Sequence, residues 1–377
     1  NVQVDTPVDK LKIVDIANRW TALSFLSKKP TTPLFGNNQI EITKKQARAM
    51  GELFFDLRSR SKINNDFSEL EAQRFVLQCV FCMFAEDRNL LPERYFSRAL
   101  DLCKRTKEST FDVLGGLFQE MNSRGKTAAG RFKGVPYFNG GLFSEIPKIA
   151  LSEGELNILY ESANEDWRTV RPSIFGNIFE ASSNWSKRHT YGQHFTSEID
   201  IYKVIRPTII EPWEEKIDAA KNINQMEDLL IKLQNFKVLD PACGSGNFLY
   251  LAYNALKDIE NELIQKISER RKSKSLKDQS ILGFVGSHQF FGIDTDPFAV
   301  ELAKVTLMIG KKVAQDRLNL TERQLPLDNL DSNIIKGDAL FIEWPEVNAI
   351  IGNPPFLGCK RLKKELGEVY VEKLYQR

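Results

Sequence analysis

The sequence is poor in cysteine and histidine and has no long apolar run. Its 377 residues include five cysteines and three histidines, which excludes a disulfide framework and the repeated ligand pairs of a structural zinc site. No apolar stretch is long enough to predict a transmembrane helix. Asp5, Asp9 and Asp15 interrupt the N-terminal segment, which excludes a signal peptide. These absences predict a protein of the reducing cytoplasm that needs no metal and no membrane.

An excess of charge of one sign is also missing. The chain has 52 basic and 50 acidic residues, and this balance does not by itself indicate nucleic-acid binding. A hydrophobic share of 42% and a charged share of 27% are ordinary for a folded globular chain. The length suggests two or three domains. The first residue is Asn rather than Met, so we expect a processed or expressed fragment.

The first part, residues 1–165, is predicted to be an all-helical spacer domain. Its apolar residues recur at intervals of three and four, the period of a helix packed on one face. Ser152 and Glu155 have capping-box spacing at one predicted helix start. Thr43 is expected to cap another helix, whose apolar face begins at Ala47.

Cys79 and Cys82 form a C-x-x-C sequence inside the apolar run from Phe75 to Phe84. Residues on every side of this predicted helix are apolar, so we expect it to be buried nearly all round. A redox or metal function requires a turn or a second ligand pair. The pattern therefore favours core packing for both thiols.

The second part, residues 166–377, changes to short apolar segments that alternate with helical patterns. Such alternation predicts an α/β fold, a Rossmann-like doubly wound parallel sheet that binds ligands at the carboxyl ends of its strands. A basic run at 261–278 is expected to be a solvated insertion rather than a DNA contact. The predicted strands cover 236–240, 290–294, 333–337 and 347–351, and the helices between the first three cover 244–258 and 297–312.

The first strand leads into D-P-A-C-G-S-G-N-F at 240–248. Gly244 and Gly246 allow a tight turn that approaches a ligand closely, and a helix with free N–H groups follows. Leu249 stands where a dinucleotide motif has its third glycine, and no G-K-[ST] follows. The acid Asp240 at the strand end suits a cationic amine better than a pyrophosphate.

Two further acids follow the second and third strands. Asp294 in G-I-D-T-D-P is placed to accept both hydroxyls of a ribose, and Asp338 in G-D-A-L-F to accept from an adenine amine between apolar neighbours. Each signal is weak alone. The two motifs support a common ligand site because they follow the glycine loop in order along the chain.

After the fourth strand comes G-N-P-P-F at 352–356. Pro354 and Pro355 stiffen the backbone and remove two N–H donors, which leaves carbonyl acceptors. Asn353 adds an amide acceptor and Phe356 a flat face. Two acceptors beside an aromatic ring form a receptor for a planar amine, and a simple structural turn is the alternative.

Together these motifs resemble the S-adenosylmethionine-dependent DNA amino-methyltransferases. The N-P-P-F form resembles enzymes that act on adenine N6 rather than cytosine N4. Upstream, F-C-M-F-A-E-D at 81–87, N-G-G-L-F at 139–143 and I-F-G-N-I-F-E at 174–180 are similar to the helical spacer of single-chain MmeI-like (type IIL/IIG) restriction–modification enzymes. The resemblance extends from about Gln39 to the C-terminus.

The resemblance implies that the chain transfers a methyl group from S-adenosylmethionine to an adenine flipped out of double-stranded DNA. The segment T-Y-G-Q-H-F-T at 190–196 is similar to the one that lies over the methionine part of the cofactor. The implied catalytic residues are Asn353, Pro354, Pro355 and Phe356. The implied cofactor contacts are Thr190, Gly192, Phe195, Thr196, Asp240, Pro241, Ala242, Gly244, Gly246, Asn247, Phe248, Asp294, Asp338 and Ala339.

The chain departs from this family in two ways. No P-D…(D/E)-x-K nuclease site precedes the helical region, and the sequence ends soon after N-P-P-F, before the target-recognition region of family members. We therefore expect a C-terminally truncated methyltransferase domain. Two alternatives stay open: a methyltransferase for cytosine N4, RNA or a glutamine amide, and an S-adenosylmethionine-binding assembly module without turnover.

Overall fold

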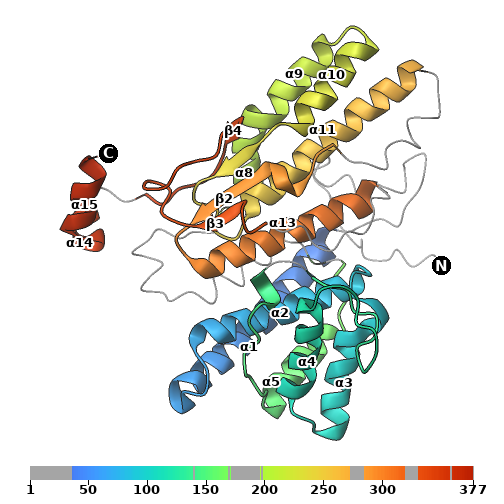
Figure 1. Ribbon diagram of the computed structural model, residues 1–377, viewed down its shortest axis with the longest axis vertical. Coiled ribbons are helices and arrows are strands. Elements are labelled where there is room, and N and C mark those ends of the chain that lie inside the picture. Colours follow the sequence, from blue (N-terminus) through green and yellow to red (C-terminus); the bar gives the residue numbers. More distant parts are fainter. Residues whose placement is uncertain are drawn as a thin grey trace, which may run out of the picture.

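The computed structural model describes residues 36–138, 141–168, 170, 196, 198–271, 284–318, 330–356 and 359–376. Its first part is a group of packed helices, drawn in the lower half of Figure 1. These elements are α1 (Gly36–Asn64), α2 (Glu69–Asp87), η3 (Pro92–Arg94), α3 (Tyr95–Thr106), α4 (Thr110–Asn122), η4 (Gly141–Phe143) and α5 (Glu153–Ala163). A spacer domain ending at residue 165 remains a prediction.

Of the two helix starts predicted from caps, one is confirmed and one is wrong. Both halves of the capping box are present at α5, where the Ser152 side chain accepts from the Glu155 N–H and Glu155 accepts from the Ser152 N–H. Thr43 was the wrong choice of cap. α1 begins at Gly36, so Thr43 lies inside the helix and is buried, because the apolar face extends further toward the N-terminus than Ala47 suggests.

α2 is the centre of the helical part and is buried on nearly every side. Cys79 and Cys82 are both fully buried, and burial raises the pKa of both thiols well above the ordinary value. The Sγ of Cys82 lies 3.7 Å from the sulfur of Met121 on α4. The prediction that these cysteines pack in the core is confirmed.

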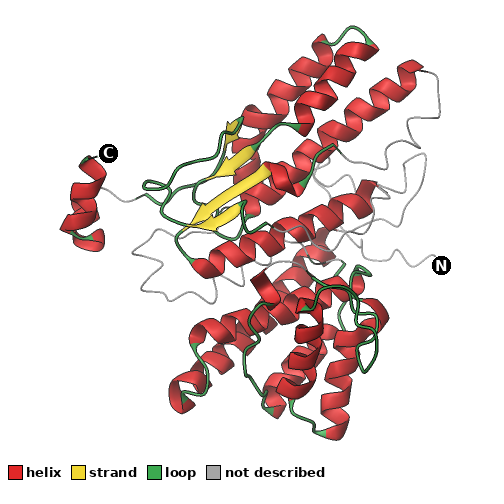
Figure 2. Cartoon of the chain, viewed as in Figure 1, coloured by secondary structure: helices red, strands yellow, loops and turns green. Residues whose placement is uncertain are grey.

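The second part contains a small parallel sheet with its helices, coloured by type in Figure 2. Pro207 lies in a π-helical segment, and Pro212 lies at the start of the helix that follows it. The regular helical hydrogen bonding is interrupted at these prolines. The elements are α8 (Glu198–Ile205), η5 (Arg206–Ile210), α9 (Glu211–Ala219), α10 (Ile223–Gln234), β1 (Val238–Asp240), α11 (Asn247–Arg271), η6 (Ser287–Gln289), β2 (Phe290–Asp294), α13 (Pro297–Leu318), β3 (Ile334–Lys336), β4 (Ala349–Ile350), α14 (Cys359–Leu366) and α15 (Glu368–Tyr375).

All strand pairs in the sheet are parallel, in the order β3-β2-β1-β4. In register, Val238 pairs with Phe290 on one side and Ala349 on the other, and Gly292 pairs with Ile334. The strands therefore end at one common edge, which we call the carboxyl edge. The predicted α/β fold, a helical region followed by a parallel sheet with its helices, is confirmed.

The basic run at 261–278 is described only as far as Arg271, and residues 272–278 lie outside the described residues. α11 continues to Arg271, and Ile267 within it is buried. Lys266 forms ion pairs with Asp218 of α9 and Glu262 of its own helix, and Arg271 pairs with Glu227 of α10. Arg270 and Arg271 are exposed at the end of α11, as expected for a solvated face, and the ion pairs hold Lys266 and Arg271 to neighbouring helices.

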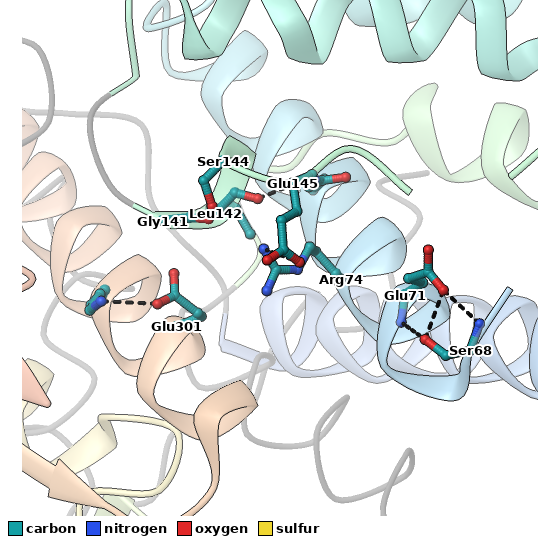
Figure 3. Close-up of polar contacts among 10 residues, drawn as sticks. Ser68, Glu71, Arg74, Gly141, Leu142, Ser144, Glu145 and Glu301 are labelled. Carbon is teal, nitrogen blue, oxygen red and sulfur yellow. Dashed lines mark hydrogen bonds and ion pairs between the residues drawn. The ribbon is translucent and has the colours of Figure 1, made fainter. Parts of the chain in front are cut away.

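α13 connects the two parts of the molecule, since it lies between the sheet and α2 (Figure 1). At one end Arg88, after α2, donates to Asp316 of α13 at 3.0 Å. At the other end a pocket opens between the two helices, and its polar surroundings are drawn in Figure 3, where Arg74 meets Glu145 at 3.3 Å. The pocket is lined by Leu70, Arg74, Leu77, Leu142, Pro297, Phe298 and Glu301.

Candidate active site

The carboxyl edge brings together the loops that carry the sequence motifs. Asp294, at the end of β2, accepts from the N–H of Gly244 in the loop after β1 at 2.9 Å. Its other oxygen accepts from the N–H of Asp296 at 2.9 Å. The N–H of Gly337, after β3, donates to the Asp294 carbonyl at 2.9 Å. Asp294 thus joins three loops through its side chain and its backbone carbonyl. Sequence reasoning missed this role because it depends on strand order.

The glycine loop after β1 requires its two glycines for different reasons. Gly244 has φ +50°, with open space around it, whereas Gly246 has φ +80° and lies against α13. A Cβ at Gly246 would stand 2.8 Å from the Cα of Ala303. The loop leads directly into α11, where Asn247 and Phe248 are buried. The positive φ values and the close packing on α13 explain why glycine stands at these positions, and close approach of this loop to a ligand stays a prediction.

Asp240 is fully buried, and burial together with the neighbouring charge of Asp294 raises its pKa to about 7. Its Oδ1 accepts from the Ala242 N–H at 3.1 Å. Its Oδ2 is buried and has no hydrogen-bond partner within the described part of the chain. A buried carboxylate oxygen without a donor is a suitable acceptor for a cationic amine.

Gly352 is a residue of this site that sequence reasoning missed. It has φ +150°, and a Cβ there would stand 2.5 Å from the Oδ1 of Asp240. The loop after β4 therefore passes close to the buried acid at the end of β1. The available signal was the glycine immediately before N-P-P-F, a position that admits no side chain.

Asn353 lies at the surface, and its Nδ2 donates to the Oγ1 of Thr196 at 3.1 Å. This contact joins two motifs that are far apart in sequence. Pro354, Pro355 and Phe356 follow on the exposed loop, and Phe356 is 85% exposed. Thr190, Gly192 and Phe195, the other residues predicted in this segment, lie outside the described residues.

Asp338, after β3, is held from two sides. Its Oδ1 accepts from the Leu340 N–H at 3.0 Å, and its Oδ2 accepts from the hydroxyl of Tyr370 at 2.7 Å. The carbonyl of the next residue, Ala339, accepts from the indole N–H of Trp344 at 2.7 Å. Tyr370 was not predicted, because nothing in its local sequence signals a contact with a loop 32 residues away.

Neither a metal site nor a membrane-spanning helix is found among the described residues. Within the described ranges, no group of three histidine, cysteine or acidic side chains is arranged to hold a metal ion. None of the helices described is long and apolar enough to cross a membrane. Cys243 is buried, and burial raises the pKa of its thiol well above the ordinary value.

The arrangement suits a ligand with a cationic amine, ribose hydroxyls and an adenine amine. Asp240 offers an acceptor that has no partner among the described residues, the glycine loop offers a backbone without side chains, and Asp294 and Asp338 stand at the next two strand ends. The chemistry of these donors and acceptors fits S-adenosylmethionine. Asn353 places an amide beside the same edge.

Two family models match the chain. Residues 215–373 match the DNA-methyltransferase domain of MmeI, and residues 70–143 match the domain described as the MmeI helicase spacer. The resemblance predicted from the motifs is confirmed in both parts of the molecule.

Similar proteins agree with these matches. DNA methyltransferase A of Bacillus subtilis is 30% identical over 313 residues, which cover 77% of this chain and 34% of that protein. The adenine-specific methyltransferase BrxX of Escherichia coli is 30% identical over 128 residues, covering 31% of this chain and 10% of that protein. The solved structure of the type IIL restriction–modification enzyme MmeI in complex with DNA has a TM-score of 0.69 and 26% identity. The matched region covers 83% of this chain and 43% of the MmeI chain. This chain thus spans about a third of the length of the first of these relatives.

Proposed function

We propose that the chain transfers a methyl group to adenine N6 in double-stranded DNA, because residues 215–373 and 70–143 match the DNA-methyltransferase and helicase-spacer domains of MmeI. S-adenosylmethionine is the proposed donor. The chain would act as the modification part of a type II restriction–modification system in the bacterial cytoplasm. The names of two adenine-specific relatives favour adenine over cytosine.

The observation that carries the proposal is the position of Asn353. Its Nδ2 donates to the Oγ1 of Thr196, and the proposal gives the remaining amide atom, Oδ1, the role of acceptor. The preceding residue, Gly352, touches the buried Asp240 of the proposed cofactor pocket. An acceptor for an amine and a carboxylate for the cofactor therefore lie on adjoining loops.

The residues of the loop after β4 would act on a flipped-out base. Flipping costs roughly a few kcal/mol, and stacking on Phe356 would return about 1–3 kcal/mol. The Asn353 side chain and the Pro354 carbonyl would accept the two N6 hydrogens, which localises the nitrogen lone pair for direct attack. Pro355 keeps the loop rigid. Orientation of the two reactants supplies much of the rate gain.

The other strand ends would hold the cofactor, which when bound supplies an electrophilic methyl group on a sulfonium. Asp240 would accept from the ammonium of the methionine part, beside the segment that contains Thr196. Asp294 would accept from the ribose hydroxyls and Asp338 from the adenine amine. The glycine loop, with Pro241 and Ala242 before it and Asn247 and Phe248 after it, would shape the floor of the pocket.

The test is a tritiated methyl-transfer assay with the wild-type chain on double-stranded DNA, RNA and a protein extract. We expect label in DNA, recovered as N6-methyladenine, and a loss of at least about a hundredfold in Asn353→Ala. Asn122→Ala, at the exposed end of α4, is the matched control and should keep full activity.

Three results would contradict the proposal. Label recovered as N4-methylcytosine would change the target base, and label in RNA or protein would change the substrate class. Binding of S-adenosylmethionine without transfer to any substrate would favour the assembly module.

A further inference from the structure

The hairpin of α14 and α15 follows the N-P-P-F loop. It contacts the loop after β3, the outer strand on the other side of the sheet from β4. β4 and β3 are the two edge strands in the order β3-β2-β1-β4. The chain leaves β4, forms the hairpin and then touches the loop after β3 through Tyr370. Figure 1 shows the hairpin beyond the carboxyl edge, where the proposed cofactor would lie.

The contacts of the hairpin with the β3 loop are specific. The Tyr370 hydroxyl donates to the Oδ2 of Asp338 at 2.7 Å. The Tyr370 ring meets Phe341 edge to face, with centroids 5.1 Å apart, and the ammonium of Lys373 lies 4.2 Å from the Phe341 ring centroid. Burial and the Asp338 carboxylate raise the pKa of Tyr370 to about 12, so its hydroxyl stays a donor at neutral pH.

These contacts leave Asp338 able to accept more. A carboxylate has about four lone-pair sites. The Leu340 N–H and the Tyr370 hydroxyl use one site on each oxygen, so each oxygen keeps a second site. An acceptor that is already held in one orientation loses less conformational freedom when it binds a donor.

We propose that Tyr370 is a positioning residue, which orients the Asp338 carboxylate to accept the amine of the cofactor's adenine. The inference rests on the proposed function, since it assumes the cofactor assigned there. It makes the hairpin part of the cofactor site, so that the segment following the catalytic loop also completes adenine recognition.

The test compares two ligands by titration calorimetry on the full chain. S-adenosylhomocysteine carries the 6-amine, and S-inosylhomocysteine has a carbonyl oxygen in its place. In Tyr370→Phe, which keeps the ring and removes only the hydroxyl, the Kd for S-adenosylhomocysteine should rise by about three- to tenfold. The Kd for S-inosylhomocysteine should change less than about twofold, because that ligand offers Asp338 no amine.

Two controls separate positioning from general packing. Tyr375→Phe alters a tyrosine of the same helix that is 81% exposed, and it should bind both ligands as the wild type does. In an Asp338→Asn background, adding Tyr370→Phe should have no further effect on either ligand, because the group that Tyr370 orients is already changed.

The outcomes distinguish this inference from the proposed function. Wild-type binding with no change in Tyr370→Phe would overturn the positioning role alone. An equal loss for both ligands would also overturn it, because the hydroxyl would then support the pocket as a whole. Failure of the folded wild-type chain to bind S-adenosylhomocysteine would overturn both.

Discussion

Glu86 in the helical part and Asp240 at the carboxyl edge are both buried acids with a raised pKa. Their surroundings differ. Glu86 accepts from the Phe96 N–H at 2.9 Å and also from the N–H and hydroxyl of Ser97. Asp240 accepts from Ala242 through one oxygen, and its other oxygen has no partner within the structure as described.

We infer from this difference that Glu86 supports the fold, whereas Asp240 has an acceptor available for the role in cofactor binding that we propose. Glu86 satisfies orphan N–H groups at the start of α3, so its desolvation is offset inside the fold. An acceptor left unpaired at Asp240 costs about 1–3 kcal/mol, which a bound cation would recover. Burial alone therefore does not distinguish the two acids, and it is the oxygen without a partner among the described residues that supports the role proposed for Asp240.

The largest expected effect on stability is at the structural acid. Glu86→Ala removes the acceptor for the start of α3 and leaves a cavity, so the free energy of unfolding should fall by about 2–4 kcal/mol. Urea denaturation measures it, with the exposed Glu93→Ala as the control. A loss below about 1 kcal/mol would show that Glu86 is not the structural member of the pair.

The pH dependence of stability is the next largest effect. Asp240 has a folded pKa of about 7 against 3.8 as its ordinary value, so the folded chain binds more protons between these limits. The contribution is fully present below the unfolded pKa and is lost as pH rises through the folded pKa. The free energy of unfolding should therefore fall by about 1–2 kcal/mol between pH 5 and pH 7. Asp240→Asn should flatten this slope, and an unchanged slope would contradict the assignment to Asp240.

The stability of Asp240→Asn at pH 8 is a further test of the difference between Glu86 and Asp240. The amide keeps an oxygen for the Ala242 N–H and removes the buried charge, so stability should be unchanged or higher by about 1 kcal/mol. Thermal unfolding at pH 8 measures this change. Destabilisation like that of Glu86→Ala would mean that Asp240 supports the fold and that the two acids do not differ.

The last comparison is between the two loop glycines, whose substitutions are expected to differ in cost. Gly244→Ala meets open space and should cost about 1 kcal/mol, from its positive φ alone. Gly246→Ala also meets the backbone of α13 and should cost more. Denaturation of both variants tests the order, and an equal or reversed order would place the close packing elsewhere.

Local sequence predicted much of this molecule, and the errors have physical causes. β2 matches its predicted bounds at Phe290–Asp294, because its apolar run ends sharply at an acid. The predicted strand that ends at Asp240 was two residues too long, because only Val238–Asp240 pairs in the sheet. The placement of the motifs at one edge of the sheet was predicted correctly, because each motif directly follows or ends an apolar segment. Contacts between distant loops, such as Asp294 with Gly244 and Tyr370 with Asp338, depend on strand order and hairpin placement, which no local pattern encodes.

The most direct test of the account is a calorimetric titration of the chain with S-adenosylmethionine at pH 8, in the wild type and in Asp240→Asn. The account predicts one binding site in the wild type and an affinity at least about tenfold lower in the variant, with both proteins folded. Equal affinities, or no binding by the folded wild type, would contradict the claim that the carboxyl edge is a cofactor site built around Asp240.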